Sequence, residues 1–306
     1  MGVPGLAKML AERLAPTDLQ SLLLETYRQR AGRRRPADVL ADYETNRFVR
    51  PAPVSARRLL AWEQVAAAHL PPEFERVVLS PVCPLGASAA IAAVDQNWAV
   101  ATARNTEVVS DSTNVLALEC AVRRRALLRA NPKSAEAVHL AASHRLLRAQ
   151  HYDSPGAVTH FSALGLCSAG RDLGGLRFEV AALARHIRFY LQSLLAFAGA
   201  DLPLHVTVSD FAAEPRQPLL HELLLAPLQA EFPATGFAFD PERTGGRGYY
   251  RELCFHVEAT NAAGRRLQLV DGGAVDWTQR LVGSAKERLI ISGLGSDRLC
   301  TEFGAD

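Results

Sequence analysis

The sequence predicts an α+β fold in which an antiparallel β-sheet is flanked by helices. Strand-length apolar runs occur in pairs separated by turn residues, which is the pattern of β-hairpins. Longer segments with apolar residues at helical spacing lie in clusters between these pairs. A chain of 306 residues that is 48% hydrophobic can bury a large core beneath such helices. Hairpins and segregated helices together favour α+β over a parallel α/β sheet.

Composition and charge argue against several classes of protein. The formal net charge of +2 gives no bulk attraction to nucleic acid. The five cysteines contain no CxxC pair, which argues against a disulfide framework or a zinc site and for a reducing compartment. No run of 18 apolar residues and no N-terminal apolar signal segment occurs. We therefore expect a soluble, cytoplasmic protein with no protein-bound metal and no membrane partner.

Residues 1–55 are predicted to form a helical extension, and residues 56–306 the core. Apolar residues in the extension recur at helical spacing around the arginine run Arg30–Arg35. This run is either a solvated helix end or a contact for nucleic acid. A helix at Ala56–Leu70 should end at Pro71-Pro72, because the proline ring cannot continue it. A short strand is predicted at Arg76–Ser80, followed by Pro81 and Pro84.

A cluster of polar side chains is predicted where strands meet the next helix, namely Arg104, Asn105, Glu107, Asp111 and Thr113. Strand-like runs at Ala89–Val94 and Ala99–Arg104 are separated by an Asp-Gln-Asn turn. Asp111, Ser112 or Thr113 can cap a helix that runs to about Ala130. In that helix Glu119 is spaced to pair with Arg123.

A long β-hairpin is predicted at Val138–Leu147 and Val158–Ala169, with a polar, mobile loop between its strands. At the mouth of the loop stand basic and polar residues, namely Arg148, Gln150, His151, His160 and Arg171. A guanidinium fixed on a strand beside such a loop suits recognition of phosphate or carboxylate. The alternative is a solvated hairpin tip with incidental charges.

The remaining elements continue the same alternation of helices and strands. They are a helix at Arg177–Ala198, a strand at Leu204–Ser209, a helix at Leu219–Ala230, a glycine-rich turn leading to a strand in ERTGGRGYYRELCFHVEA, a strand at Arg266–Val270 ending at Asp271-Gly272-Gly273, a helix at Asp276–Val282 and a strand at Arg288–Ser292. A sharp turn, Gly293–Leu299, then opens a final helix.

The last strand and the run SGLGSDRL resemble motif 3 of class II aminoacyl-tRNA synthetases, in which an arginine contacts the ATP phosphates. By this resemblance Arg298 contacts the γ-phosphate. The hairpin resembles motif 2, which implies Arg148 at the α-phosphate, Gln150 in the ATP site, and His160 or Phe161 stacked on adenine. The Ala56–Leu70 helix, the next strand and Pro81 or Pro84 resemble motif 1, which forms the dimer.

Among the subclasses, the sequence is most similar to histidyl-tRNA synthetase. The segment from Arg104 to Thr113 resembles the segment that binds the amino acid's ammonium group, with Asp111 and Thr113 in its acid-x-Thr spacing and Glu107 as a rival acid. GRGYYRELCFHV resembles a second segment, which nominates Arg247 to polarise the carboxylate and Tyr249 and Tyr250 to line the pocket. Strand alternation would point only one of the two tyrosines inward. DGGAVDWTQRLVG resembles a third, which brings Asp271, Gly272 and Gly273 to the pocket floor.

The resemblance covers residues 56–304, and the chain departs from the family at three places. It stops shortly after motif 3, so no anticodon-binding domain is expected and tRNA is an unlikely partner. Motif 2 reads Arg148-Ala149-Gln150 where the family has Arg-x-Glu, which loses an anionic contact. The tyrosine segment is two residues shorter and lacks its aspartate.

The resemblance implies an ATP- and Mg²⁺-dependent enzyme that forms an aminoacyl adenylate, with Arg148, Arg247 and Arg298 as its catalytic residues. The acyl group would pass to a small molecule, a carrier protein or another non-tRNA acceptor, and the enzyme would be a homodimer. The alternative is a non-catalytic sensor of an amino acid, resembling the regulatory subunit of ATP phosphoribosyltransferase. A third reading is a nucleic-acid-binding module that uses Arg30–Arg35.

Overall fold

The computed structural model describes residues 3–150, 159–214 and 216–303. The predicted hairpin loop, including His151, falls mostly on residues 151–158, which lie outside the described residues. The α-helices are α1 (Leu6–Glu12), α2 (Pro16–Ala31), α3 (Pro36–Thr45), α4 (Ala56–His69), α5 (Ser112–Ala130), α6 (Arg177–Ala198), α7 (Gln217–Leu220), α8 (Ala226–Glu231), α9 (Trp277–Val282) and α10 (Ser296–Glu302). Shorter turns are the π-helices η1 (Ala87–Ile91) and η3 (His221–Leu225) and the 3₁₀-helix η2 (Gln96–Trp98).

The strands form an eight-stranded sheet in the order β1-β4-β5-β10-β9-β8-β6-β7 and a small sheet of β2 and β3. Their bounds are β1 (Phe74–Arg76), β2 (Val82–Pro84), β3 (Thr106–Val108), β4 (Val138–Leu147), β5 (His160–Arg171), β6 (Leu204–Asp210), β7 (Gly236–Phe239), β8 (Leu253–Thr260), β9 (Arg266–Val275) and β10 (Glu287–Gly295). The α+β class is confirmed, and the predicted antiparallel sheet is confirmed in part, because the sheet is mostly antiparallel but mixed. The pairs β1–β4 and β6–β7 are parallel, because a helical crossover joins each pair and returns the chain to the same end of the sheet.

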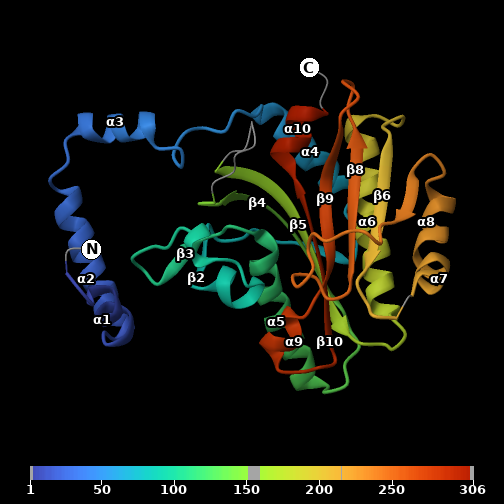
Figure 1. The fold of residues 1–306 in the computed structure, drawn as a ribbon, viewed down its shortest axis with the longest axis horizontal. Coiled ribbons are helices and arrows are strands. Elements are labelled where there is room, and N and C mark those ends of the chain that lie inside the picture. Colours follow the sequence, from blue (N-terminus) through green and yellow to red (C-terminus); the bar gives the residue numbers. More distant parts are fainter. Residues whose placement is uncertain (1–2, 151–158, 215, 304–306) are drawn as a thin grey trace.

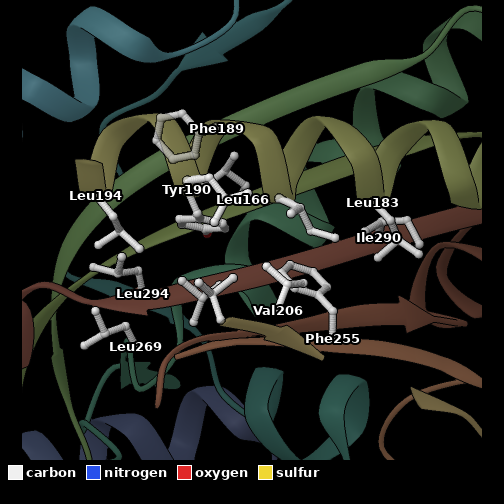
Figure 2. Packing of buried hydrophobic residues seen from close by; sticks show 14 of the residues in the cluster. Leu166, Leu183, Phe189, Tyr190, Leu194, Val206, Phe255, Leu269, Ile290 and Leu294 are labelled. Carbon is white, nitrogen blue, oxygen red and sulfur yellow. The ribbon is translucent and has the colours of Figure 1, made fainter. Parts of the chain in front are cut away.

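Helices cover both faces of the large sheet (Figure 1). Helices α4, α6 and α10 pack on one face, and α5 and α9 pack on the other. Successive strand residues alternate between the two cores, so that Ala141 belongs to the first core while Leu140 and Ala142 belong to the second. Figure 2 shows Leu183 and Leu194 of α6 packed against apolar side chains of the central strands. This double covering leaves the ends of the central strands as the place for a binding site.

Several predicted elements are confirmed by the structure. β4 and α6 have the predicted bounds, and α4 ends one residue early. Among the three candidate caps of α5, Asp111 is the one used, because its side chain accepts a hydrogen bond from the backbone N–H of Thr113. The Glu119–Arg123 pair forms, with 2.8 Å between Oε1 and Nε.

The region before α5 differs from the prediction. The run Ala89–Val94 overlaps the π-helix η1 instead of forming a strand, since alanine-rich sequence favours helical backbone over extended backbone. Ala99–Arg104 forms only an isolated bridge, Ala101 with Glu107. The predicted strand Arg76–Ser80 is also displaced, because regular pairing with β4 spans Phe74 to Arg76. Strands β2, β3 and β7 were missed, each being only three or four residues long.

The two glycine-containing strands near the C-terminus are longer than predicted. β9 continues through Asp271-Gly272-Gly273 to Val275, and β10 continues to Gly295 before α10 begins. A Cβ atom on Gly272 would lie 2.5 Å from Ser292 Cβ, and one on Gly273 would lie 2.7 Å from Tyr250 Cδ1. These glycines therefore permit close packing within a strand and do not end it.

The N-terminal helices α1, α2 and α3 extend away from the sheet in Figure 1. None of their residues is buried. In the arginine run after α2, Arg34 pairs with Asp42 and Arg35 with Asp38, so part of its charge is neutralised within the extension. Within the described ranges, no helix combines the length and hydrophobicity needed to cross a membrane.

Candidate functional site

A cavity of about 570 Å³, here called the central cavity, lies at the ends of the central strands. Its walls come from the last residues of β4 and β10, the first residues of β5, and the first half of β9. The starts of α5 and α10, the segment around Trp98 and the turn before β8 complete them. The volume is typical of a small-molecule site. Of the predicted site residues, the cavity brings together Asp111, Thr113, Arg148, Gln150, Phe161, Tyr249, Tyr250, Asp271 and Arg298.

Arg148 lies one residue beyond β4 and points into this cavity. Its Nε donates to the carbonyl of Ser110 at 2.9 Å, and one Nη lies 3.1 Å from a carboxylate oxygen of Asp111. Its Cζ lies 5.2 Å from the centroid of the Phe161 ring, a distance at which a cation is attracted to an aromatic face. A hydrogen bond, an ion pair and a ring thus fix the guanidinium, while a third of the side chain stays exposed to the cavity.

Asp111 has two roles in the structure, as the cap of α5 and as the partner of Arg148. One carboxylate oxygen caps α5 by accepting from the N–H and the hydroxyl of Thr113, at 2.9 and 2.8 Å. The other oxygen holds Arg148. The capping residue of α5 therefore also orients the guanidinium.

The rival acid, Glu107, lies outside the central cavity and is fully buried. Its carboxylate accepts hydrogen bonds from the N–H of Gly86, the N–H and hydroxyl of Ser88 and the amide of Gln96, at 2.7 to 2.9 Å. Burial opposes ionisation, but these donors outweigh it and hold the pKa of Glu107 below its usual value. Glu107 joins the η1 and η2 turns to β3.

The two residues predicted to contact adenine have different surroundings. Phe161 lines the central cavity, beneath Arg148. His160 lies outside the cavity lining, where its Nδ1 is 2.9 Å from an Nη of Arg145 and its Nε2 is 2.6 Å from the carbonyl of Arg50. Of the pair, only Phe161 offers a ring to a ligand in the cavity.

Arg298 stands in the first turn of α10, at the rim of the central cavity. One Nη donates to the carbonyl of Gln268 at 3.2 Å. In the part of the chain that the structure describes, no carboxylate lies within ion-pair distance of this guanidinium, although its neighbour Asp297 is paired with Arg145. Arg298 thus keeps donors available for an anion.

Both tyrosines line the central cavity, contrary to the strand alternation expected for them. The segment before β8 is a turn in which Gly246 and Gly248 have positive φ values of 85° and 83°, so successive side chains do not alternate between faces. The two rings meet edge to face, with centroids 5.0 Å apart. Burial raises the pKa of both hydroxyls well above its usual value, aided by Asp271 at both tyrosines and by Asp111 at Tyr249, which keeps them as neutral hydrogen-bonding groups.

Arg247, nominated for the carboxylate, faces a different cavity. Its Cζ lies 4.6 Å from the centroid of the Phe211 ring, and its Nε lies 3.3 Å from the carbonyl of Arg243. It lines a second cavity of about 530 Å³ that shares Tyr249 and Tyr250 with the central one.

Arg243 is a candidate that the sequence reasoning missed. It is buried behind Tyr250 and Asp271 and lines neither cavity, with one Nη 3.0 Å from the Asp271 carboxylate and the other without a hydrogen-bond partner among the described residues. Although burial opposes it, His256 and Arg243 hold the pKa of Asp271 below its usual value. A buried donor without an acceptor is costly unless a ligand supplies one. Spacing in a glycine-rich turn could not distinguish Arg243 from Arg247.

Asn114 is a second missed residue, and it supplies an acceptor. Its side chain is 3% exposed and lines the central cavity, yet its Oδ1 has no hydrogen-bond partner among the described residues. Its position in the first turn of α5 resembles that of any polar helix-entry residue, so the sequence carried no distinguishing signal.

Gly272 and Gly273, expected at the pocket floor, lie in β9 beside the central cavity and not on its surface. They act through their neighbours, because the absent Cβ atoms leave room for Ser292 and Tyr250, which do line the cavity. Among the described residues, no three His, Cys, Asp or Glu side chains gather to hold a metal ion.

The architecture is similar to those of solved class II aminoacyl-tRNA synthetase-like proteins. A structure described as an ATP phosphoribosyltransferase regulatory subunit/histidyl-tRNA synthetase from Bacillus halodurans C matches with a TM-score of 0.59 at 12% identity, over 84% of this chain and 83% of that chain. Apo histidyl-tRNA synthetase from S. aureus matches with a TM-score of 0.56 at 14% identity, over 79% of this chain and 64% of that chain. Neither a protein-family model nor a curated protein matches the sequence. The likeness establishes the class II synthetase-like fold.

Proposed function

We propose that the chain binds ATP and an amino acid in the central cavity, forms an aminoacyl adenylate, and transfers the acyl group to a non-tRNA acceptor. The observation that carries this proposal is the guanidinium of Arg148, which Ser110, Asp111 and Phe161 hold in the lining of a cavity of about 570 Å³. A preorganised cation of this kind stabilises negative charge that develops during phosphoryl or nucleotidyl transfer.

In the proposed reaction a carboxylate oxygen of the amino acid attacks the α-phosphorus of ATP in line. The new bond joins that oxygen to phosphorus, and the bond to the bridging oxygen breaks as pyrophosphate leaves. Arg148 would contact the α-phosphate, and Arg298, with donors available at the rim, would contact the γ-phosphate. The protein contributes position and charge, and performs no covalent step itself.

We assign the amino acid to the part of the central cavity between α5 and the tyrosine turn. Asn114 Oδ1 is an acceptor without a partner among the described residues, and the carboxylate of Asp111 lies in the same wall, so an ammonium group would be bound there. Arg243 lies behind Tyr250 and Asp271, outside the cavity lining, and one of its Nη atoms has no hydrogen-bond partner among the described residues, so we name it beside Arg247 as a candidate for the carboxylate. Tyr249 and Tyr250 would then pack against the side chain of the amino acid.

Mg²⁺ would enter as part of the substrate, bound to the ATP phosphates. The described residues offer no cluster of three metal-ligating side chains, and Mg²⁺ in nucleotide sites usually keeps several waters and substrate oxygens among its ligands. Its role would be to neutralise the phosphates, beside Arg148 and Arg298.

The direct test is a thermal-shift screen with MgATP and each amino acid, followed by ATP–pyrophosphate exchange with those that stabilise the protein. Exchange with at least one amino acid is expected. The acceptor would then be sought among small amines, thiols and carrier proteins by following loss of the acyl group from the adenylate. Stabilisation by MgATP and an amino acid with no exchange would rule out catalysis.

A second candidate function is an amino-acid sensor without catalysis. It is favoured by Gln150, which lines the central cavity at the position where the class II motif has a glutamate. An uncharged amide there cannot supply the anionic contact of that glutamate. Stabilisation by one amino acid alone, without MgATP dependence and without exchange, would favour this alternative.

A further inference from the structure

The chain between α3 and α4 passes the loop end of the β4–β5 hairpin (Figure 1). We call residues Arg47–Arg50 the linker segment. Arg47 donates from one Nη to the carbonyl of Ala149 at 2.8 Å, and its own carbonyl accepts the hydroxyl of Thr159 at 2.7 Å. One residue of the linker segment therefore joins the two ends of the hairpin loop.

A third contact fixes the other end of the linker segment. His160 Nε2 lies 2.6 Å from the carbonyl of Arg50 and must donate, since a carbonyl can only accept. In the neutral ring Nδ1 is then the acceptor, which fits its 2.9 Å contact with an Nη of Arg145. The carbonyl of Arg50 in the linker segment thus selects the Nε2–H tautomer of the neutral ring.

The residues that the linker segment holds are those that place Arg148. The N–H of Arg148 donates to the carbonyl of Thr159 at 2.8 Å, and the N–H of Ala149 donates to the carbonyl of Trp98 at 2.8 Å. Both polar backbone atoms of Ala149 are consequently occupied, one by Arg47 and one by Trp98. A shift of the hairpin end that moved Arg148 would break the contacts of Arg47.

We propose that Arg47 is a positioning residue for Arg148, acting through Ala149 and Thr159, and that the linker segment holds the hairpin in the form that binds ATP. This inference rests on the proposed function for its catalytic consequence. The guanidinium of Arg50 also lies 5.2 Å from the ring of Tyr43 in α3. The linker segment thereby connects the N-terminal helices to the nucleotide-binding end of the sheet.

The test compares Arg47→Ala and Thr159→Val with Arg33→Ala, a matched control that removes a positive charge from the extension away from the hairpin. The first readout is hydrogen exchange of the Arg148 and Ala149 amides in the full-length protein. Each lost hydrogen bond should speed their exchange roughly threefold to tenfold. Arg47→Lys, which retains a donor, should restore part of the protection, and Arg33→Ala should match the wild type.

The second readout is pyrophosphate exchange. The KM for ATP should rise roughly threefold to tenfold in Arg47→Ala and Thr159→Val, with the KM for the amino acid unchanged, because Arg47 contacts the residues that flank the hairpin loop, next to Arg148. A purely structural role would lower the melting temperature without separating the two KM values. Unchanged amide exchange in both variants would overturn the inference. If the wild type shows no pyrophosphate exchange, the proposed function fails instead, and the amide exchange alone decides the role of the linker segment.

Discussion

Arg148 is held by partners that lie outside its own strand β4. Ser110 and Asp111 belong to the entrance of α5, and Phe161 belongs to β5. Arg148→Ala removes the cation but leaves β4 and its pairing untouched, so we expect the fold to persist. The rate of ATP–pyrophosphate exchange should fall by about 10²–10³, as when other preorganised donors are removed.

Arg298→Ala should lower the same rate, with a larger effect on the KM for ATP than on that for the amino acid. Arg266→Ala is the control for both variants, because Arg266 pairs with Glu258 at the surface of the same sheet and is half exposed. Circular dichroism and thermal melting would verify the folds. Undiminished exchange in Arg148→Ala, with a folded protein, would disprove the mechanism.

The two tasks of Asp111 can be separated by two substitutions. Asparagine is a good helix cap, so Asp111→Asn should preserve the start of α5 while removing the charge that pairs with Arg148. Alanine removes both, and should lower the free energy of unfolding by a further 0.5–2 kcal/mol, roughly the value of a cap. Urea denaturation measures the stability, and ATP–pyrophosphate exchange measures the pairing. Equal stability of the two variants would contradict a capping role.

At the scale of elements, a chain of buried hydrogen bonds ties α6 to the sheet. His186 of α6 lies 2.9 Å from Ser168 of β5 through Nε2 and 2.7 Å from Ser292 of β10 through Nδ1. Ser168 continues the chain to His139 of β4, and Ser292 continues it to Tyr190 of α6. Four elements are thereby joined beneath the central cavity, whose wall includes Ser292.

This network makes stability depend on pH. Burial, aided by the charge of neighbouring groups, lowers the pKa of His186 from 6.5 to about 3 and that of His139 to about 4. The unfolded chain therefore binds more protons than the folded chain below pH 6.5, and stability falls as the pH falls. The contribution of His186 is about 1.4 kcal/mol per pH unit between about pH 6 and pH 4. Urea denaturation at several pH values should show a shallower slope for His186→Gln than for the wild type. Identical slopes would contradict the assignment.

The elements that the sequence predicted well are those with a repeated pattern. α6 and β4 each sustain one period over ten or more residues, so local sequence and burial agree. The run at Ala87–Ile91 has no such pattern, and β7 consists of four half-buried residues paired in parallel with β6. β9 passes through two glycines because Ser292, Phe255 and Tyr250 occupy the space that side chains would need. These contacts come from residues that are distant in the sequence, so local sequence cannot predict that the strand continues.

The site shows the same limit. The position of Arg148 in the central cavity could be predicted, because Arg148 directly follows a regular strand, β4. Glu107 and Asp111 are both acids near a helix entrance, and only their partners distinguish them. Glu107 accepts from four donors in the η1 and η2 turns, whereas Asp111 pairs with Arg148. Arg243 and Arg247 stand in an irregular turn, where spacing specifies no direction.

For the whole molecule, the edges of the sheet bear on assembly. β1 is one of the two edge strands of the large sheet, and it pairs with β4 over only three residues. Beyond it Val78 is 98% exposed, and Leu60 on the preceding helix α4 is 60% exposed. An edge strand that ends in an exposed apolar segment is a ready surface for a second copy of the chain. These elements are also the ones that resemble the dimer-forming motif 1.

We therefore predict a homodimer that depends on Val78. A carboxylate placed at the centre of an apolar interface must be desolvated without a partner, so Val78→Asp should weaken self-association at least about tenfold. Leu223→Asp is the matched control, because Leu223 is also an exposed apolar residue. It lies on η3, in the connection between β6 and β7, and these strands are at the edge of the sheet opposite β1. Light scattering coupled to gel filtration, over a range of protein concentrations, gives the mass of each variant. A wild-type monomer, or a dimer that Val78→Asp leaves intact, would refute assembly through this edge, and equal weakening by Leu223→Asp would place the contact elsewhere.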